Sequence, residues 1–444
     1  MTAVSKPVWV WLPDRPEPTE CGLFTLEGSI GQFEYRRSYV ADHDLALDPV
    51  HLPVGSRSRT IREQKQDGLF GVIRDAKPEG YGLDLLAQVR KVGIDDHMAV
   101  LEEAEGDAVG ALAVCDDVSR KQGFHCPRSE DLLAILAGVP DTRPASDAVR
   151  EVQGLAGTSA GGERPKLTVL HDGQQWLAKL QDRGDRPHSP LREFVAMKVA
   201  AALGVNTAEV QFRRVEEREV ILVRRFDREV LPDGGVTRSL YASAHTVLGL
   251  DKQMRGSRER SYVALAHELQ RWGGRGDSEG GRVVEARREL FRRIVLNAVL
   301  GNGDDHPRNT GFLFDGKSWS LSPAFDIAPY GIAFAGNQSM DISRSKTHAA
   351  SSAAFNLIDA CEDYGYLEEE ARDYVAHARR EAPVLWAKQV VAAGYEEQDL
   401  PFNHPIGWTP NDLQSLAANA PGSVEIAIPH LTGARGTPHR GCQA

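Results

Sequence analysis

The sequence predicts an α+β protein with a β-rich first half and a mainly helical second half. Short segments rich in branched and aromatic residues, bounded by Pro, Gly and Asp, recur up to residue 226, and this pattern is typical of strands. Beyond residue 240, apolar residues recur at helical spacing instead. We therefore expect structural units that differ in secondary structure.

Length, composition and charge limit the class of protein further. The 444 residues suffice for two or three domains, and 41% hydrophobic and 26% charged residues are typical of a globular protein. No apolar run approaches the roughly 20 residues of a membrane-spanning helix, and no signal peptide is evident, so we expect a cytoplasmic protein. The net charge of −11 argues against a general nucleic-acid binder. The five scattered cysteines indicate neither a disulfide framework nor a zinc site.

The first predicted unit, residues 1–145, is an α+β subdomain. It begins with the strand-like segments "VWVWL", "GLFTL" and "GQFEY". Gly80 and Gly82 then precede an apolar pattern of helical period, and "EGDAVGALAV" follows. The Pro-containing stretch "AGVPDTRPASD" marks the boundary with the next unit.

The second predicted unit, residues 146–236, contains a glycine-rich loop from Gly154 to Gly162. A strand around Leu167–Leu170 follows, and a turn joins it to a second strand that carries Lys179. Lys179 alternates with apolar neighbours, so its ammonium group is expected to face a cleft.

A helix is predicted next, with Ser189 as its N-cap and Pro190 at its first position. Glu193 is placed in its first turn, and the helix ends before Gly204. The strand "VILVRRF" precedes Asp227. In a structural interpretation of this segment, Asp227 pairs with Arg228 and fixes the junction of the lobes.

The third predicted unit, residues 237–400, is mainly helical. A helix from about Val284 has one apolar face and stops at Gly301. The segments "GFLF" and "SWSL" then form a hairpin that leads to Asp326. Residues 401–444 are expected to be a partly disordered extension.

The segment "NGDDHPRN" and the isolated Asp326 point to phosphoryl transfer from ATP, which needs a base, Mg²⁺ ligands, a lysine and a glycine-rich lid. Asp304 lies five residues before Asn309, which matches the D-x-x-x-x-N spacing of kinase catalytic loops. Asn309 and Asp326 offer the hard oxygen ligands that Mg²⁺ prefers. Lys179, held by Glu193, would contact the phosphates.

Other interpretations of the same residues remain open. Asp304 and Asp305 are also typical of a turn after a helix. His306 beside two acids resembles a transition-metal site, although a second imidazole or thiol at ligand spacing is missing. Lys179 could be a solvated strand residue, and Glu193 could be favoured by the helix dipole alone.

Five motifs in this order resemble the HipA-like serine/threonine kinases, the toxin components of HipA/HipB toxin–antitoxin modules: "GTSAGGERPK", "WLAKL", "VRRFDR", "NGDDHPRNTGFLF" and "LSPAFDIAPY". "DAKPEGYGLDLL" resembles their N-terminal subdomain. The resemblance implies a bilobal protein-kinase-like fold, with a small β-rich N-terminal lobe and a larger helical C-terminal lobe.

The resemblance also implies roles for single residues. Asp304 would be the catalytic acid/base, Asn309 and Asp326 the Mg²⁺ ligands, and Lys179 the ATP-phosphate lysine. The remaining nucleotide-binding residues would be Glu193, His306, Gly157, Thr158, Ser159, Ala160, Gly161 and Gly162. The regulatory phosphorylation site would be Thr158 or Ser159. The hinge is expected in "SLYASAHTVLG", which lacks the acidic segment of some members.

The implied partners are a HipB-like DNA-binding antitoxin, with DNA contacted only through it, and a translation component such as an aminoacyl-tRNA synthetase as substrate. Two other functions are alternatives to that of a protein kinase. One is a small-molecule kinase of related fold, and the other is a catalytically weak regulatory partner of an antitoxin.

Overall fold

The computed structural model describes residues 2–55, 59–138, 164–181, 185–251, 259–274, 280–329 and 336–403. The predictions for the glycine-rich loop and for most of the C-terminal extension lie outside these residues. The structure contains both β-strands and α-helices, which confirms the α+β class.

A five-stranded antiparallel sheet forms the N-terminal unit, in the order β4-β3-β2-β1-β5. Its strands are β1 (Val4–Trp11), β2 (Pro18–Glu27), β3 (Ile30–Tyr35), β4 (Ile61–Glu63) and β5 (Leu112–Val114). Phe24 and Phe33 are buried and lie directly opposite each other in the β2–β3 register. Such cross-strand aromatic pairs stabilise a sheet and fix its register.

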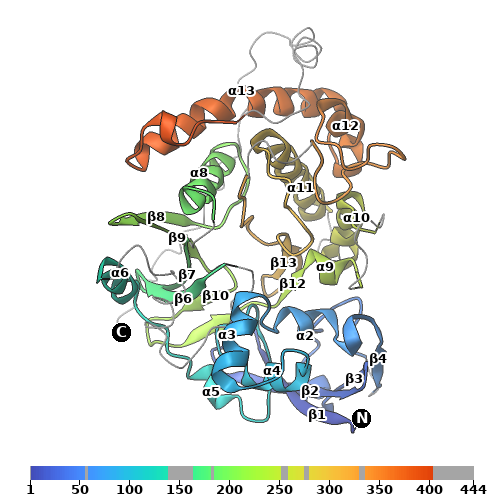
Figure 1. The fold of residues 1–444 in the computed structure, drawn as a ribbon. Helices are drawn as coiled ribbons and strands as arrows, with labels where there is room; N and C mark the ends of the chain where they lie inside the picture. The colour runs from blue at the N-terminus through green and yellow to red at the C-terminus, as the bar shows by residue number, and fades with distance from the viewer. Residues whose placement is uncertain are drawn as a thin grey trace, which may run out of the picture.

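Short helices cover this sheet and connect it to the rest of the chain. They are α1 (Arg37–Asp42), η1 (Lys65–Gly68), α2 (Gly71–Asp75), α3 (Tyr81–Arg90), α4 (His97–Glu103) and α5 (Ser119–Gln122). Helix α2 packs against strand β12 (Tyr241–Ser243) and helix α9 (Ala244–Val247), so it links the N-terminal unit to the helical part (Figure 1).

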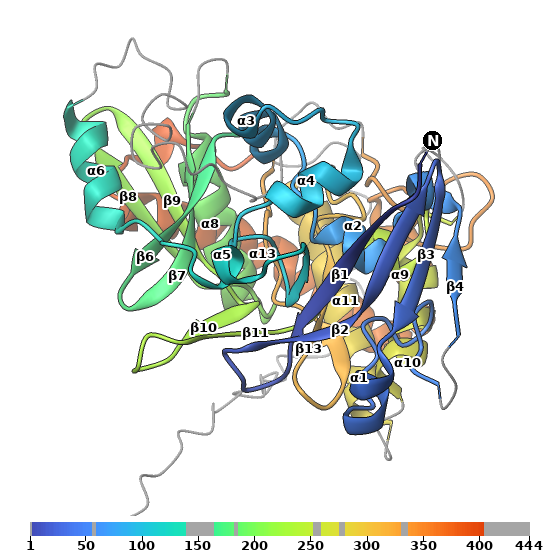
Figure 2. The ribbon, with the colours of Figure 1, turned by 90° about the horizontal axis from the view of Figure 1, so that it is seen from below.

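A second antiparallel sheet has the order β6-β7-β9-β8, and Figure 2 shows it on the other side of the molecule from the first sheet. Its strands are β6 (Lys166–His171), β7 (Gln174–Leu180), β8 (Val210–Val215) and β9 (Arg218–Arg224). Helix α6 (Ser129–Gly138) covers one face, where Leu132 packs with Ala178 and Leu180. Side chains alternate along a strand, so Lys179 faces the opposite side.

Helix α8 (Ser189–Ala202) packs on the opposite face of this sheet. The predicted N-cap is wrong by one residue, because His188 occupies the cap in a left-handed conformation and Ser189 is already helical. The Ser189 hydroxyl accepts a hydrogen bond from Arg164 instead of capping the helix (2.7 Å). Glu193 consequently lies in the second turn rather than the first.

A hairpin of β10 (Arg228–Val230) and β11 (Val236–Arg238) leads into the third part of the chain. A three-stranded sheet then combines β12 (Tyr241–Ser243), β13 (Gly311–Phe314) and β14 (Trp319–Leu321) in that order. The antiparallel pairing of β13 with β14 confirms the predicted hairpin before Asp326.

The remaining described elements are helical. They are α9 (Ala244–Val247), α10 (Tyr262–Gly273), α11 (Gly281–Leu300), α12 (Ala354–Asp359), η3 (Cys361–Tyr364), α13 (Glu368–Ala392) and η4 (Glu397–Asp399). Helix α11 ends at Gly301 as predicted. The φ of Gly301 is +71°, a left-handed conformation that glycine adopts without the steric cost of a Cβ atom. Helix α13 packs across α8 and α11 (Figure 1). In the described part of the chain, no helix has the length and apolar character to cross a bilayer.

Candidate active site

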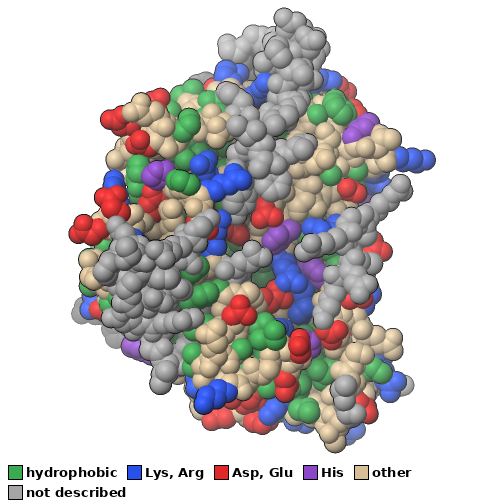
Figure 3. Space-filling view, in the orientation of Figure 1, with side chains coloured by type: hydrophobic (Ala, Val, Ile, Leu, Met, Phe, Trp, Pro, Cys, Tyr) green, Lys and Arg blue, Asp and Glu red, His purple; other side chains and the backbone are tan. Residues whose placement is uncertain are grey.

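One cavity of about 770 Å³ brings together the residues that the sequence singled out in distant segments. Its walls come from the second sheet, from the loop after α11 and from the N-terminal unit. The predicted residues that line it are Lys179, Glu193, Asp304, His306, Asn309 and Asp326. Figure 3 shows Lys, Arg and His side chains gathered in the hollow across the middle of this face.

Lys179 lies between two carboxylates. Its Nζ donates to Glu193 Oε1 and to Asp326 Oδ1, each at 2.7 Å. The Glu193 side chain is 5% exposed, whereas that of Asp326 is 38% exposed and borders the cavity. The lysine is therefore fixed by a buried anchor on one side and reaches an accessible carboxylate on the other.

Burial and neighbouring charges act in opposite directions on the pKa of Asp326 and on that of Lys179. Burial disfavours the ionised form of Asp326, but Lys179 and Lys166 outweigh it and hold the pKa of Asp326 below its usual range. Burial would likewise lower the pKa of Lys179, and Asp326 and Glu193 outweigh it and raise that pKa. Lys179 and Asp326 are therefore both charged at neutral pH.

A second lysine, Lys166, was not anticipated from the sequence. It lies on β6 directly opposite Lys179 on β7, and it lines the same cavity. Burial, together with repulsion from Lys179, lowers the pKa of Lys166 to about 8. Only the pairing register of the two strands shows that these lysines are neighbours.

The loop that carries Asp304 folds back on itself. The backbone N–H of His306 donates to Asp304 O (2.7 Å), and that of Asn309 donates to His306 O (2.8 Å). The side-chain amide of Asn309 donates to Asp304 O (3.1 Å). These bonds bring residues five positions apart into contact and leave both side chains on the cavity wall.

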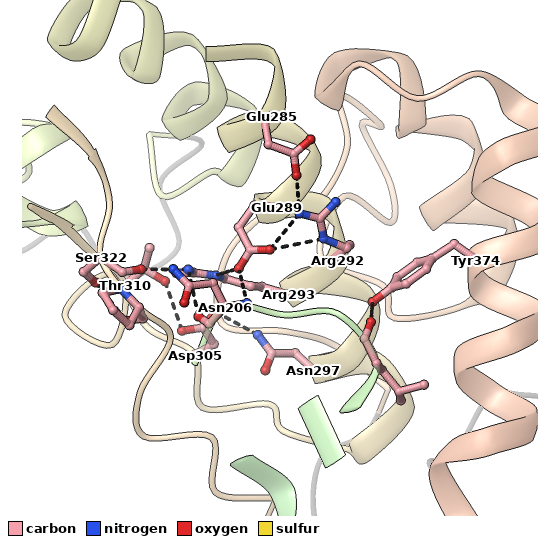
Figure 4. Close-up of polar contacts among 12 residues, drawn as sticks. Asn206, Glu285, Glu289, Arg292, Arg293, Asn297, Asp305, Thr310, Ser322 and Tyr374 are labelled. Carbon is pink, nitrogen blue, oxygen red and sulfur yellow. Dashed lines mark hydrogen bonds and ion pairs between the residues drawn. The ribbon is translucent and has the colours of Figure 1, made fainter. Parts of the chain in front are cut away.

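Asp305 faces the opposite way and supports the loop from below. Its Oδ2 accepts from the Tyr262 hydroxyl (2.6 Å) and from Asn297 Nδ2 (2.8 Å), and its Oδ1 accepts from the Thr310 hydroxyl (3.4 Å). Figure 4 shows this carboxylate among its partners on α11 and the loop. Burial raises the pKa of Asp305 despite these donors. The two adjacent acids therefore have different environments.

Asp326 is delivered by a segment that is anchored on both sides. Ala324 exchanges backbone hydrogen bonds with the Asn206–Ala208 segment, and Arg293 of α11 donates to Ser322 O (2.7 Å). The Arg293 guanidinium is held in turn by Glu289 (Figure 4). Asp326 itself has a φ of +59°, a left-handed conformation rare for residues other than glycine. Such strain persists where the surroundings fix a functional residue.

The segment after β9 borders the cavity together with the predicted hinge. Arg225 and Phe226 line it, as do Tyr241 and Ser243 of "SLYASAHTVLG". Asp227 pairs with Arg228 (3.3 Å) as predicted and more tightly with Arg225 (2.7 Å). Its Oδ2 also accepts from the Gly110 N–H of the N-terminal unit (2.8 Å).

The predicted phosphate-loop residues cannot be placed in this geometry. Gly157, Thr158, Ser159, Ala160, Gly161 and Gly162 lie outside the described residues. The described chain resumes at Arg164, which lines the cavity beside Lys166.

Two models of the HipA family match this chain. The HipA-like C-terminal domain matches residues 158–386, which is more than half of the chain, and the HipA N-terminal domain matches residues 10–115. The chain therefore belongs to the HipA family of serine/threonine protein kinases, which is a toxin–antitoxin family. This confirms the family resemblance found in the motifs.

Individual relatives are distant. The protein Y4mE of Sinorhizobium fredii is 24% identical over 336 residues, which cover 69% of this chain and 74% of Y4mE. The serine/threonine-protein kinase toxin HipA of Shewanella oneidensis is 21% identical over 276 residues, which cover 56% of this chain and 60% of the toxin.

A solved structure of Shewanella oneidensis HipA, in a complex with HipB and operator DNA, has a similar fold. Its TM-score is 0.62 at 17% identity, and the match covers 93% of this chain and 94% of that one. At this identity the likeness concerns the fold alone.

Proposed function

We propose that this chain is an ATP- and Mg²⁺-dependent protein kinase of the HipA toxin type, which transfers the γ-phosphate of ATP to a serine or threonine of another protein. The observation that carries the proposal is the convergence of Lys179, Asp326 and the Asp304–Asn309 loop on one cavity. Phosphoryl transfer depends on this kind of placement of charge.

In this proposal, each residue of the cavity has a role that follows from its position. Lys179 would contact ATP phosphates, and Glu193 keeps it in place with a 2.7 Å hydrogen bond. Lys166 would add a second positive charge from the neighbouring strand. Apolar side chains on the sheet side of the cavity, which include Ile221, Val223 and Phe226, offer a surface for the adenine ring.

The proton of the acceptor hydroxyl would pass to the Asp304 carboxylate as the hydroxyl oxygen bonds to the γ-phosphorus and the bond to ADP breaks. Asn309 and Asp326 provide an amide and a carboxylate oxygen, which fit the preference of Mg²⁺ for hard ligands. When bound there, the ion would neutralise charge that develops on the phosphates. Among the described residues, no three His, Cys, Asp or Glu side chains gather as a metal cage, so water and phosphate would complete the coordination.

Several finer assignments belong to this proposal. The lobes would be residues 146–236 and 237–400, with residues 1–145 as an added subdomain and 401–444 as an extension. Thr158 or Ser159 would receive a phosphate by autophosphorylation. A HipB-like antitoxin would restrain the kinase and contact DNA, and a translation component such as an aminoacyl-tRNA synthetase would be the substrate. Cytoplasmic location follows from these partners.

The test is phosphate transfer from γ-labelled ATP with Mg²⁺. Wild-type protein should label itself or a protein in a lysate, and Asp304→Ala or Asp326→Ala should abolish the label. Asp373→Ala, an exposed residue on α13, is the matched control and should behave as wild type. Label that appears only in a metabolite would favour a small-molecule kinase. Antitoxin binding without ATP turnover would favour a regulatory partner.

A further inference from the structure

The N-terminal unit contributes positive charge to the same cavity that holds Asp304. Arg74 of helix α2 and Lys77 just after it line the cavity. Arg308 joins them from the catalytic loop, one residue before Asn309. These residues come from other elements than Lys166 and Lys179, which belong to the second sheet.

The two nearby carboxylates, Asp75 and Glu79, are shared among several groups, and Asp75 Oδ1 lies 3.8 Å from Arg74 Nη2. Asp75 accepts from the Ser243 N–H (2.7 Å), the Ser243 hydroxyl (2.8 Å) and the Thr246 hydroxyl (2.7 Å). Glu79 pairs closely with Arg308, and its other oxygen lies 3.7 Å from Arg74. Glu79 is therefore shared between two guanidinium groups.

Lys77 has no carboxylate of its own. Its Nζ makes one weak contact, with the Pro78 carbonyl oxygen at 3.4 Å, and no carboxylate of the described residues lies within salt-bridge distance. Arg74 is buried, and its Nε has no hydrogen-bond partner within the described part of the chain. Burial lowers the pKa of Lys77 to about 8, Arg74 and Arg308 add to this effect, and the more distant Asp95 opposes it only in part.

Three cations thus share two carboxylates, and Lys77 has no salt bridge within the described residues. A partly desolvated cation without a partner raises the free energy of the protein, and a bound anion would recover part of it. We propose that Arg74, Lys77 and Arg308 form an anion subsite on the acceptor side of the cavity, which binds a carboxylate or phosphate group close to the hydroxyl that is phosphorylated. The substrate class is then an acidic or already phosphorylated protein segment. This inference rests on the proposed kinase function.

The acceptor side is favoured over the ATP phosphates by the position of Arg308. It lies four residues after Asp304, the base for the acceptor hydroxyl, in a loop that folds back on itself. The ATP phosphates already have Lys166 and Lys179 on adjacent strands. The N-terminal unit would thus help to select the substrate.

A positional-scanning peptide library with a central serine or threonine tests the inference through activity. With Mg-ATP, wild type should favour Asp, Glu or phosphoserine at one position near the centre. Lys77→Met should reduce this preference about tenfold, which is the size of one charge-assisted hydrogen bond, and leave the KM for ATP unchanged. Lys77→Arg should restore it, and the exposed Lys388→Met is the matched control. An identical preference in Lys77→Met, or a raised KM for ATP, would overturn the proposal.

A binding experiment tests the subsite even if the protein transfers no phosphate. The protein with Mg²⁺ and AMP-PNP is labelled with acetic anhydride, and modification of Lys77 is followed by mass spectrometry. Inorganic phosphate should protect Lys77, and protection by acetate as well would extend the ligand class to carboxylates. Lys388 should label equally in all samples. Failure of both anions to protect Lys77, or full protection by AMP-PNP alone, would refute the subsite without bearing on kinase activity.

Discussion

The Lys179 ammonium lies 2.7 Å from the Asp326 carboxylate, although the two residues are 147 positions apart in the chain. Glu193 holds the same ammonium at the same distance from the other side. The three side chains thus form a linked unit between the second sheet, helix α8 and the segment after β14.

Lys179→Met should remove phosphate transfer and also weaken the fold. It leaves the buried Glu193 without its partner, whereas water can solvate part of Asp326. We expect a loss of about 2–3 kcal/mol in the free energy of unfolding, below the 3–5 kcal/mol seen when fully buried pairs are broken. Urea unfolding measures this change.

The double variant Lys179→Met/Glu193→Gln is the control for this explanation. Neutralising the unpaired glutamate should recover part of the lost stability, while activity stays absent. If the two residues did not interact, the effects of the two changes would add. The double variant would then be less stable than Lys179→Met by the full effect of Glu193→Gln alone, and this outcome would contradict the explanation.

Substitutions of the adjacent acids Asp304 and Asp305 should have different effects, one on the rate of phosphate transfer and the other on the stability of the fold. Asp304→Asn is expected to lower the rate of phosphate transfer by at least about a hundredfold, with an unchanged melting temperature, because the base is lost and the shape is kept. Asp305→Ala should destabilise the protein by about 3 kcal/mol, because it leaves the buried donors of Tyr262 and Asn297 unsatisfied. Rate measurements and thermal unfolding of both variants check this contrast. Equal effects of the two changes on both quantities would contradict the assigned roles.

Local patterns in the sequence predicted much of this site. Strand alternation indicated that Lys179 faces away from the apolar Ala178 and Leu180, and the structure places those two against α6. The turn residues before Asp326 predicted the β13–β14 hairpin. The D-x-x-x-x-N spacing of kinase catalytic loops indicated Asp304 and Asn309, and both residues line the same cavity.

The residues that were missed depend on contacts between distant segments. Lys166 needs the β6–β7 register to be recognised, and Arg74 needs the docking of α2 beside β12. Asp305 carries no local sign that it faces inward, because only the positions of Tyr262 and Asn297 show this. The cap of α8 shifted to His188 because the Ser189 hydroxyl bonds to Arg164, 25 positions away.

Nucleotide affinity should fall as the pH rises above 8, because Lys166 loses its proton there. Its pKa of about 8 is set by burial and by the facing groups Lys179, Asp326, Glu193 and Arg164, and Lys179 keeps its charge because its own pKa is raised. Binding of Mg-AMP-PNP, measured by calorimetry, should weaken about three- to tenfold between pH 7 and pH 9.5.

The deprotonation of Lys166 should affect the free energy of unfolding in the opposite direction to nucleotide affinity. Between pH 8 and 10.5 the unfolded chain holds a proton on Lys166 that the folded protein has released, so this residue makes the folded state more stable as the pH rises. Lys166→Arg should keep its charge and flatten the pH dependence of nucleotide affinity, whereas Lys77→Met should leave that dependence intact. An unchanged pH profile in Lys166→Arg would exclude Lys166 as its source.

Asp75 should couple the N-terminal unit to the catalytic loop. Its carboxylate holds Ser243 and Thr246 at the start of α9, and the His245 N–H of α9 donates to the Pro307 carbonyl oxygen in the loop (2.9 Å). Asp75→Ala removes three hydrogen bonds and should cost about 2–4 kcal/mol of unfolding free energy. Amide hydrogen exchange should accelerate at residues 243–246 and in the Asp304–Asn309 loop, and phosphate transfer should slow. The exposed Asp84→Ala, in the same unit, should change neither. Faster exchange confined to the N-terminal unit, with a normal loop and a normal rate, would show that Asp75 serves only the stability of its own surroundings.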